Sequence, residues 1–392
     1  MGKPILLVLF CTALFFFACK DKADRNKQIL VRNTMDMNRS NETVSVDIAS
    51  LGPIYSEGGI ILSDAKTQKE IVSQEIDADG DGNIDAVLFQ PEVKANSEIT
   101  IDVILREKGS TSDSIPACYS RFVPERTDDY AWENNRVAFR TYGPTAQKMI
   151  EDGVKGGTLS SGIDAWLKRV EYPIINKWYK KETSGAGSYH EDNGEGFDNF
   201  HVGKSRGIGG IAKKIDTTYY FSKNFTSWET LYNGPIRTSF ILTYADWDTA
   251  GNPISEEKHI SLDYGSNLSK FEVKLKGTDT ISAGLTLHEK DGKIGVNLKN
   301  GWISYWEPHG DSELGTAIIV PENNLIGYEH YLTDRKDESN LYAHLKTNGS
   351  KVTYYAGFGW KKSDQFSTKD EWEAYVDKFA QCLETPLMVE VK

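Results

Sequence analysis

Short runs in which apolar and polar residues alternate dominate the chain from residue 28 onward. A period of two places successive side chains on opposite faces of a β-strand. The early runs are rich in β-branched residues and are separated by Asn, Asp and Gly clusters, which are typical of turns. They predict strands at residues 29–31, 44–48, 60–62, 99–105 and 117–125.

The next run, residues 133–142, alternates clearly and predicts a further strand. Its two faces differ in character, because one is apolar and the other carries two cations. The apolar face has Val137 and Phe139, and the opposite face has Arg136, Ala138 and Arg140.

The pattern changes between residues 145 and 214. Residues 161–169 and 174–179 are predicted to be helical or irregular. Residues 184–214 contain so many Gly residues that we predict one long loop. A loop of this length inside a compact domain is either functional or disordered, and its aromatic residues favour an ordered, functional loop.

Alternation returns after residue 218 and predicts strands at residues 219–221, 236–244, 257–263, 270–276, 285–288, 315–321, 352–358 and 388–391. Ser367 begins a predicted helix that has acidic residues in its first turn and ends near Leu383. Many antiparallel strands with few helices predict a mainly β fold, a β-supersandwich of two large stacked sheets. The sequence shows neither a linker nor a repeat, so residues 28–392 are predicted to form one domain.

The first residues predict export. Residues 1–18 have a positive start and an apolar run that is too short to span a bilayer, as in a signal peptide. The run ends at Ala18-Cys19, which is the arrangement of a lipoprotein cleavage site, although an ordinary signal with an incidental Cys is the alternative. Cleavage would leave Cys19 as the lipidated N-terminus and residues 19–27 as a polar tether. We therefore expect a lipid-anchored protein of the cell envelope, on the periplasmic face or the outer-membrane surface.

The formal net charge of the 392-residue chain is −12. This argues against nucleic acid as a partner, and against electrostatic binding to anionic lipid. Aromatic residues make up 11% of the chain, which fits both a β core and a surface that stacks sugar rings. Beyond residue 19 only Cys118 and Cys382 remain, and the sequence leaves open whether they pair or stay separate thiols.

An alternation of oxygen-bearing side chains and Gly between residues 77 and 85 suggests calcium. The position at which a calcium loop carries its bidentate Glu is Leu88, which favours a tight turn between strands, with calcium as the alternative. The candidate ligands are Asp77, Asp79, Asp81, Asn83 and Asp85.

The Gly-rich segment 188–210 is the strongest functional candidate. It combines two His residues with acids and cations, and its glycines let the backbone approach a ligand closely. Residues 133–214 hold 13 Lys and Arg against 10 Asp and Glu, so this region is positive within a negative chain. We therefore predict an anion site, such as one for a carboxylated or sulfated sugar. Its candidate cations are Arg136, Arg140, Lys168, Arg169, Lys204 and Arg206.

Several segments together resemble the domain of unknown function 4861 family, a family of secreted lipoproteins whose genes lie in polysaccharide-degradation clusters. They are residues 133–144, Ser161–Asp164, Tyr189-His190 with Gly194, Gly196 and Asp198, Val202-Gly203, Asn233–Arg237 and Ala356–Trp360. The resemblance covers most of residues 28–392 and implies a galactose-mutarotase-like supersandwich. Some relatives look like oligosaccharide dehydratases that act on a terminal uronic acid.

The favoured hypothesis is β-elimination at a uronate, which requires no cofactor. His190 is the predicted base, and Tyr189, Tyr142 or His201 protonates the leaving oxygen. Water leaves in a dehydratase and a glycan leaves in a polysaccharide lyase, and the same groups serve both. The substrate is an anionic oligosaccharide, and its predicted contacts are Arg140, Lys204, Arg206, Asp198, Arg136 and Trp306.

Two alternatives stay open. One is a glycoside hydrolase with paired carboxylates, for which Glu191, Glu195 and Asp198 are candidates. The other is a glycan-binding lipoprotein without catalytic activity, because a fold of this kind hosts many functions.

Overall fold

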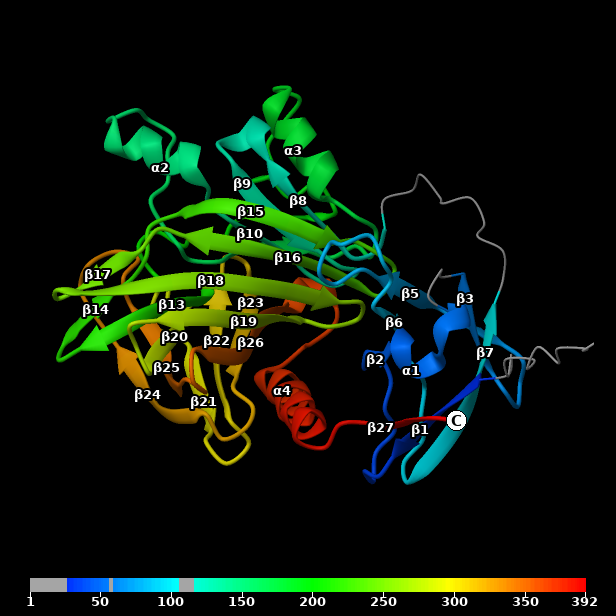
Figure 1. Cartoon of the computed structure of the whole chain (residues 1–392). Helices are drawn as coiled ribbons and strands as arrows, with labels where there is room; N and C mark the ends of the chain where they lie inside the picture. Colours follow the sequence, from blue (N-terminus) through cyan, green and yellow to red (C-terminus); the bar gives the residue numbers. More distant parts are fainter. Residues whose placement is uncertain (1–26, 56–58, 106–115) are drawn as a thin grey trace, which may run out of the picture.

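The computed structural model describes residues 27–55, 59–105 and 116–392 (Figure 1). The predicted signal peptide, the lipidated Cys19 and nearly all of the tether lie outside these residues and stay predictions. Among the described residues, no helix combines the length and the apolar character needed to cross a membrane.

The N-terminal strands form a unit of two antiparallel sheets. The first has the order β27-β1-β7-β3-β4 and the second the order β2-β6-β5. The strands are β1 (Lys27–Asn33), β2 (Val44–Asp47), β3 (Ile60–Asp64), β4 (Glu70–Ile71), β5 (Ser73–Ile76), β6 (Ala86–Phe89), β7 (Ser97–Leu105) and β27 (Met388–Val391), with the short helices α1 (Ile48–Leu51) and η1 (Pro53–Tyr55). This unit buries its own apolar cluster, and the last strand of the chain completes it beside β1. That the whole of 28–392 acts as one domain stays a prediction.

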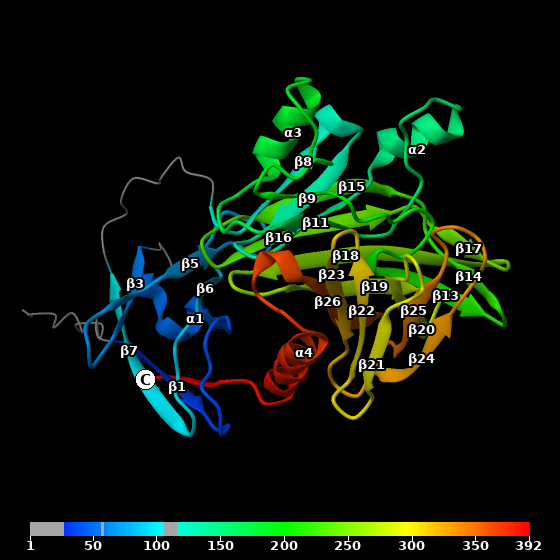
Figure 2. The same ribbon diagram turned by 180° about the vertical axis from the view of Figure 1, so that it is seen from behind.

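Two larger antiparallel sheets form the body of the molecule (Figures 1 and 2). The nine-stranded sheet runs β15-β16-β18-β19-β26-β23-β22-β21, with β17 paired to β18, and the five-stranded sheet runs β14-β13-β20-β25-β24. Their strands are β13 (Ile208–Ile215), β14 (Thr218–Tyr220), β15 (Phe225–Tyr232), β16 (Arg237–Tyr244), β17 (Trp247–Thr249), β18 (Asn252–Asp263), β19 (Leu268–Lys276), β20 (Thr280–Thr286), β21 (Lys293–Asn297), β22 (Trp302–His309), β23 (Ser312–Ile319), β24 (Leu325–Tyr331), β25 (Asn340–Lys346) and β26 (Lys351–Trp360).

A third layer has the strand order β12-β11-β10-β9-β8. Its strands are β8 (Tyr119–Val123), β9 (Asp129–Glu133), β10 (Ala138–Thr141), β11 (Asp164–Lys168) and β12 (Gly196–Phe197), and the helices η2 (Pro124–Arg126), α2 (Pro144–Glu151) and α3 (Ile175–Thr183) belong to the same segment. One face of this sheet adds Trp132, Phe139 and Leu167 to the main core. The other face packs Trp166 against Trp178 and Tyr179 of α3.

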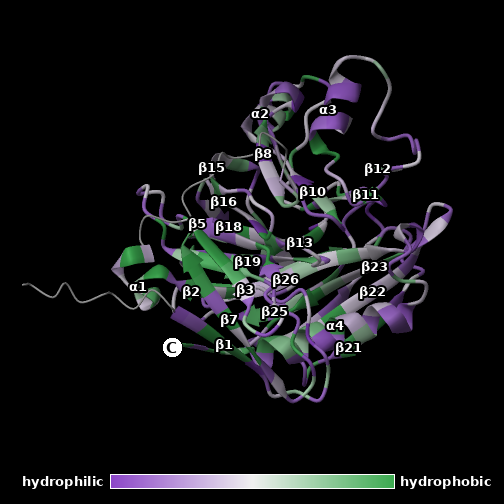
Figure 3. Cartoon of the chain, turned by 90° about the vertical axis from the view of Figure 1, so that its right-hand side faces the viewer, coloured by the Kyte–Doolittle hydropathy of each residue, from purple (hydrophilic) through white to green (hydrophobic). Residues whose placement is uncertain are grey.

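The helix α4 (Lys369–Glu384), which follows η3 (Lys361–Ser363), covers the outer face of the nine-stranded sheet. Trp372, Val376 and Ala380 are buried against that sheet, and Figure 3 shows both green and purple residues along the helix, as expected for one buried side. Thr368, rather than the predicted Ser367, caps the N-terminus by accepting a hydrogen bond from the Glu371 backbone N–H.

The predicted fold class, a mainly β supersandwich of stacked antiparallel sheets with few short helices and a C-terminal helix, is confirmed. Besides the helix cap, two local predictions were wrong. Residues 164–168 form β11 instead of helical or irregular structure, because the strand is buried on both faces and its alternation is hidden. The predicted loop 184–214 contains β12 and all of β13 except its last residue, Ile215.

The glycines of this segment allow the close backbone contact that precedes β13. Gly207 has a φ of +62° and makes a parallel bridge with Ile163, whose carbonyl oxygen would lie 1.9 Å from a Cβ at residue 207. A larger residue would therefore separate the third layer from the main sandwich. Cys118 and Cys382, for which pairing was left open, are both free thiols.

Candidate functional site

Alternation along three neighbouring strands brings opposite charges onto one face of the third layer. Asp129 of β9, Arg140 of β10 and Asp164 of β11 share the face that is turned toward α3, and Arg140 pairs directly with Asp164 across the strands. Asp198 joins them from the residue after β12. The predicted division into two faces is confirmed for Val137 to Arg140, whereas Arg136 lies in the turn between β9 and β10 and not on the face of Arg140.

Arg140 is the centre of this buried cluster. Its Nε donates to Asp164 at 2.6 Å, its Nη2 donates to Asp198 at 2.7 Å, and its Nη1 lies 3.6 Å from Asp129. The Tyr189 hydroxyl accepts a further hydrogen bond from Nη1 at 3.0 Å. Because Asp164, Asp198 and the Tyr189 hydroxyl occupy the three nitrogens of the buried guanidinium, Arg140 holds the loop from within, and the direct contact with a sugar carboxylate predicted for it does not fit this geometry.

Three carboxylates share one buried cation, so the cluster has a strong affinity for protons. Burial, with the charge of Asp198 adding to it, raises the pKa of Asp164 to about 7, although Arg140 opposes the shift. Burial likewise raises the pKa values of Asp129 and Asp198 to about 6. Desolvation of excess negative charge is the dominant cause.

These raised pKa values predict a pH-dependent stability. A carboxyl whose pKa is higher in the folded state than in the unfolded state contributes stability that is fully present below the unfolded pKa and is lost as the pH rises through the folded pKa. For Asp164 this window runs from 3.8 to about 7. Between pH 8 and pH 5 the wild type should gain on the order of 2 kcal/mol relative to Asp164→Asn. Urea unfolding of both proteins at the two pH values measures the difference, and parallel curves would contradict the prediction.

His190 lies at the surface of this cluster on the loop that closes over it. The Asp198 backbone N–H donates to the Tyr189 carbonyl at 2.8 Å, and His190 Nδ1 lies 2.8 Å from the Asp198 carbonyl oxygen. Since a carbonyl can only accept, Nδ1 carries the proton and the Nε2 of the neutral ring keeps its lone pair. About half of the side chain is exposed, at 53%, and the ring packs 4.6 Å from that of Tyr189. His190 is thus held in the tautomer of a base.

Arg126, at the end of η2, is a cation beside this loop that sequence reasoning missed. Its Nε donates to the Tyr189 hydroxyl at 3.0 Å, on the same oxygen that Arg140 contacts. The side chain is partly exposed, and its terminal nitrogens make no hydrogen bond to any residue that the structure describes. Arg126 can therefore offer a forked pair of donors to an external carboxylate, which Arg140 cannot.

The other predicted catalytic side chains differ in their exposure to solvent. Tyr142 is buried and its hydroxyl donates to Asp164 at 3.3 Å, and Tyr189 is buried as well. His201 is exposed, and its Nδ1 lies 3.1 Å from Asp337. Of the three predicted proton donors, His201 is the one that solvent reaches.

The predicted substrate contacts do not gather in one place. Arg206 is fully buried and donates to Ser161 and to the Lys204 carbonyl, and burial lowers its pKa to about 10. Trp306 is buried beneath α4. Arg136 donates to Asn267, and the exposed Lys204 lies 3.8 Å from Glu338.

The remaining predicted cations have structural roles. Lys168 is completely buried and donates to Glu133 at 2.8 Å, while Glu133 accepts from two backbone N–H groups at the start of α3. Arg169 pairs with Asp192 at 2.7 Å on the loop. Lys168 and Arg169 therefore form ion pairs that hold α3 and the loop in place, instead of contributing to a positive surface patch.

The acids proposed for a hydrolase are not a free pair. Asp198 is held by Arg140, and Glu195 accepts hydrogen bonds from Lys177, Tyr172 and Trp178. Glu191 is exposed. This arrangement does not favour the two-carboxylate mechanism with these residues.

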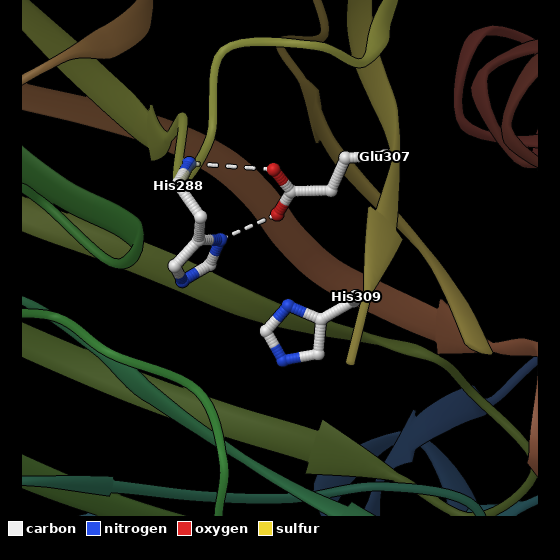
Figure 4. Close-up of side chains that lie close together, drawn as sticks. All are labelled: His288, Glu307 and His309. Carbon is white, nitrogen blue, oxygen red and sulfur yellow. Dashed lines mark hydrogen bonds and ion pairs between the residues drawn. The ribbon is translucent and has the colours of Figure 1, made fainter. Parts of the chain in front are cut away.

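Phe200 and His201 of the loop contact a second polar cluster, made of His288, Glu307 and His309, which Figure 4 shows. His288 follows β20, while Glu307 and His309 stand two residues apart on β22 and share its inner face. His288 Nδ1 lies 2.5 Å from Glu307, and the His288 and His309 ring centroids are 4.9 Å apart. Burial raises the pKa of Glu307, and burial together with His288 lowers the pKa of His309 to about 4. In the sequence, Glu307 and His309 lie near two tryptophans and His288 follows Leu287, so nothing in the sequence brings the three together.

The segment 77–85 is a turn of the β5–β6 hairpin. The Asp77 carboxylate accepts from the backbone N–H groups of Gly80 and Gly82, and Asp85 accepts from Ala78. The Asp79 and Asp81 carboxylates accept from the N–H groups two residues ahead. These bonds are those of the favoured tight turn, and calcium at this loop stays a prediction.

A cavity of about 610 Å³ lies at the junction of the N-terminal unit with α4. Arg136, Arg237 and Asp263 are among the residues that line it. None of residues 188–206 contributes to this lining. The cavity and the loop therefore occupy different places, and the candidate catalytic side chains gather at the loop.

The model of a domain of unknown function (DUF4861) matches residues 31–389. The chain belongs to this family. It is 52% identical over 397 residues to a Formosa agariphila protein described as "Uncharacterized protein P7", and the match covers all of both chains.

Two solved structures resemble the chain more distantly. One is an alpha-mannosidase from Enterococcus faecalis V583, with a TM-score of 0.45 and 11% identity, and the other is a glycosyl hydrolase family 38 protein from Enterococcus faecalis, with a TM-score of 0.43 and 12% identity. Each match covers 94% of this chain, which spans 46% and 48% of the two proteins. Likeness at this level carries no argument about activity.

Proposed function

We propose that this protein acts on uronic-acid-containing oligosaccharides and catalyses β-elimination at a uronate. The observation that supports this most directly is His190, a half-exposed imidazole whose Nδ1 is fixed by the Asp198 carbonyl so that Nε2 is free to accept a proton. The resemblance to secreted proteins of polysaccharide-degradation clusters favours a sugar as substrate, and family membership covers the residues involved.

In this mechanism Arg126 binds the sugar carboxylate. Neutralising that carboxylate makes the neighbouring C5 hydrogen more acidic, because the negative charge that develops on the carboxylate in the transition state is stabilised. Arg126 and His190 both contact Tyr189, Arg126 through its hydroxyl and His190 through its ring, and this shared contact supports assigning them to one site. The buried Arg140 cluster acts through the loop by holding Tyr189 and Asp198 in place.

The bond changes are those of a simple elimination. His190 Nε2 takes the proton from C5, the electron pair of that bond forms the C4–C5 double bond, and the C4–O bond breaks. The leaving oxygen takes a proton from His201, so that either water or a shortened glycan departs. The loop supplies both the base and the acid, and no electron is gained or lost.

Product analysis tests the proposal. The full-length protein is incubated with uronate oligosaccharides, and the products are analysed by mass spectrometry and ultraviolet absorbance. Loss of one water from an intact oligosaccharide indicates a dehydratase, and cleavage into an unsaturated fragment indicates a lyase. Saturated products that have gained water would contradict elimination and favour a hydrolase. Tight binding of the intact oligosaccharides without any product would favour the glycan-binding alternative.

Replacement of Arg126 should show whether it binds the sugar carboxylate. Arg126→Met removes charge-assisted hydrogen bonds that bind the carboxylate and strengthen in the transition state, so kcat/KM for a uronate substrate should fall about 10- to 100-fold, through kcat as well as KM. Arg126→Lys should recover part of the loss. The methyl ester of the same substrate has no carboxylate, so wild type and variant should turn it over equally. An equal loss on both substrates would assign Arg126 a purely structural role.

A further inference from the structure

We propose that His288, Glu307 and His309 form a binding site for a divalent transition metal, with zinc as the natural probe. One ligand atom from each of the three lies within 4.8 Å of the others. Two imidazoles and one carboxylate are a donor set that zinc uses in proteins, with a remaining position for water or substrate. The site contains none of the side chains assigned to elimination, and the proposal does not rest on the proposed function.

The surroundings match those of a metal site more than those of an ordinary core. The side chains of His288, Glu307 and His309 are 10%, 1% and 7% exposed. A carboxylate buried this deeply is stable only with a cation or with hydrogen-bond donors beside it. His288 donates to Glu307 through Nδ1, and a metal ion would supply the positive charge. His309 Nε2 and the nearby Asn199 Oδ1 are both buried without a hydrogen-bond partner among the described residues. A polar pocket with spare acceptors is well suited to a cation.

The strands bring these donors together from distant parts of the sequence. Glu307 and His309 project from one face of β22 in the nine-stranded sheet, and His288 follows β20 in the five-stranded sheet. Figure 4 shows the Glu307 carboxylate between its own strand and His288, with the His309 ring on the same side. Because two packed sheets fix the donors, the site would need only small side-chain rotations to close around an ion.

The hydrogen bonds also connect this site to the loop. His288 Nδ1 donates to Glu307, while its Nε2 accepts from the His201 backbone N–H at 3.3 Å. If a cation replaces the proton between His288 Nδ1 and Glu307, the neutral ring must carry its proton on Nε2. That nitrogen can then no longer accept from His201. Metal binding at Nδ1 therefore moves the ring proton of His288 to Nε2 and breaks the contact with the part of the loop that carries His201.

Zinc titration tests the site without any assay of activity. Full-length protein is treated with a chelator, incubated with zinc chloride, freed of excess metal, and analysed for bound zinc and for its unfolding temperature. The wild type should bind one zinc per chain and unfold at a higher temperature with zinc than without. Glu307→Gln and His309→Ala should each lose at least 90% of the bound zinc.

Two control variants separate this site from other sources of zinc. His330→Ala removes an exposed imidazole of β24 and should keep the full zinc content. Asp79→Asn alters the acidic β5–β6 turn and should also keep it. Circular dichroism establishes that each variant is folded. A wild type that binds no zinc, or a folded His309→Ala protein that keeps it all, would overturn the proposal, as would loss of zinc in Asp79→Asn.

Discussion

Replacing Arg140 with methionine should destabilise the protein by about 3–5 kcal/mol. The substitution leaves Asp129, Asp164 and Asp198 buried without the cation they share, and removing one partner of a buried ion pair leaves the cost of desolvation uncompensated. Methionine fills a similar volume, so the loss of stability measures the missing positive charge more than a change in packing. Urea unfolding monitored by the fluorescence of the buried tryptophans measures the effect.

The matched control is Arg169→Met. Arg169 also holds the loop, through Asp192, but both side chains of this pair are partly exposed. A pair of this kind contributes at most about 1 kcal/mol. The Arg140→Met defect should also shrink at pH 5, because the freed carboxyls then take up protons. If the two variants lose equal stability, the buried cluster is not the anchor of the loop.

Replacing His190 with alanine should lower kcat on a uronate oligosaccharide by about 10²- to 10⁴-fold, the usual contribution of a positioned general base. The loop should stay in place, because the His190 side chain contributes one hydrogen bond, to the Asp198 carbonyl. Tyr189 and Asp198 stay joined by their backbone hydrogen bond, and Arg140 still binds the Asp198 carboxylate. His190→Gln is the more conservative variant, since its amide can still donate to the Asp198 carbonyl but cannot act as a base.

The split between kcat and KM separates catalysis by His190 from a structural role. If His190 acts as the base, His190→Gln should lower kcat and leave KM for the oligosaccharide close to that of the wild type. His330→Ala, which removes an exposed imidazole elsewhere, should behave as the wild type. A His190→Gln enzyme with wild-type kcat would remove His190 from the mechanism.

The sequence predicted those parts of the fold in which alternation is visible. Strands with one solvated face and the two faces of residues 133–142 followed directly from a period of two. The strand β11 did not, because Ala165 and Leu167 enter the main core while Asp164 and Lys168 are also buried, by ion pairs. Burial on both faces removes the polar signal on which the prediction depends.

The candidate site was predictable where its residues share a segment and not where pairing of strands brings them together. Tyr189, His190 and Asp198 lie on one Gly-rich segment and were found. Arg126 and Asp129 lie between two predicted strands and were not singled out, and only the position of β9 beside β10 brings Asp129 to Arg140. Charge counting likewise found the cations of this region, but it could not show that Asp129, Asp164 and Asp198 neutralise Arg140.

The fate of the hydrogen at C5 of the uronate tests the proposed chemistry most directly. A uronate oligosaccharide that carries deuterium at C5 is incubated with the wild-type protein, and the product is examined by mass spectrometry and NMR. Elimination by His190 predicts that the product has lost the deuterium and has a double bond between C4 and C5. A product that keeps deuterium on a saturated C5 would contradict elimination.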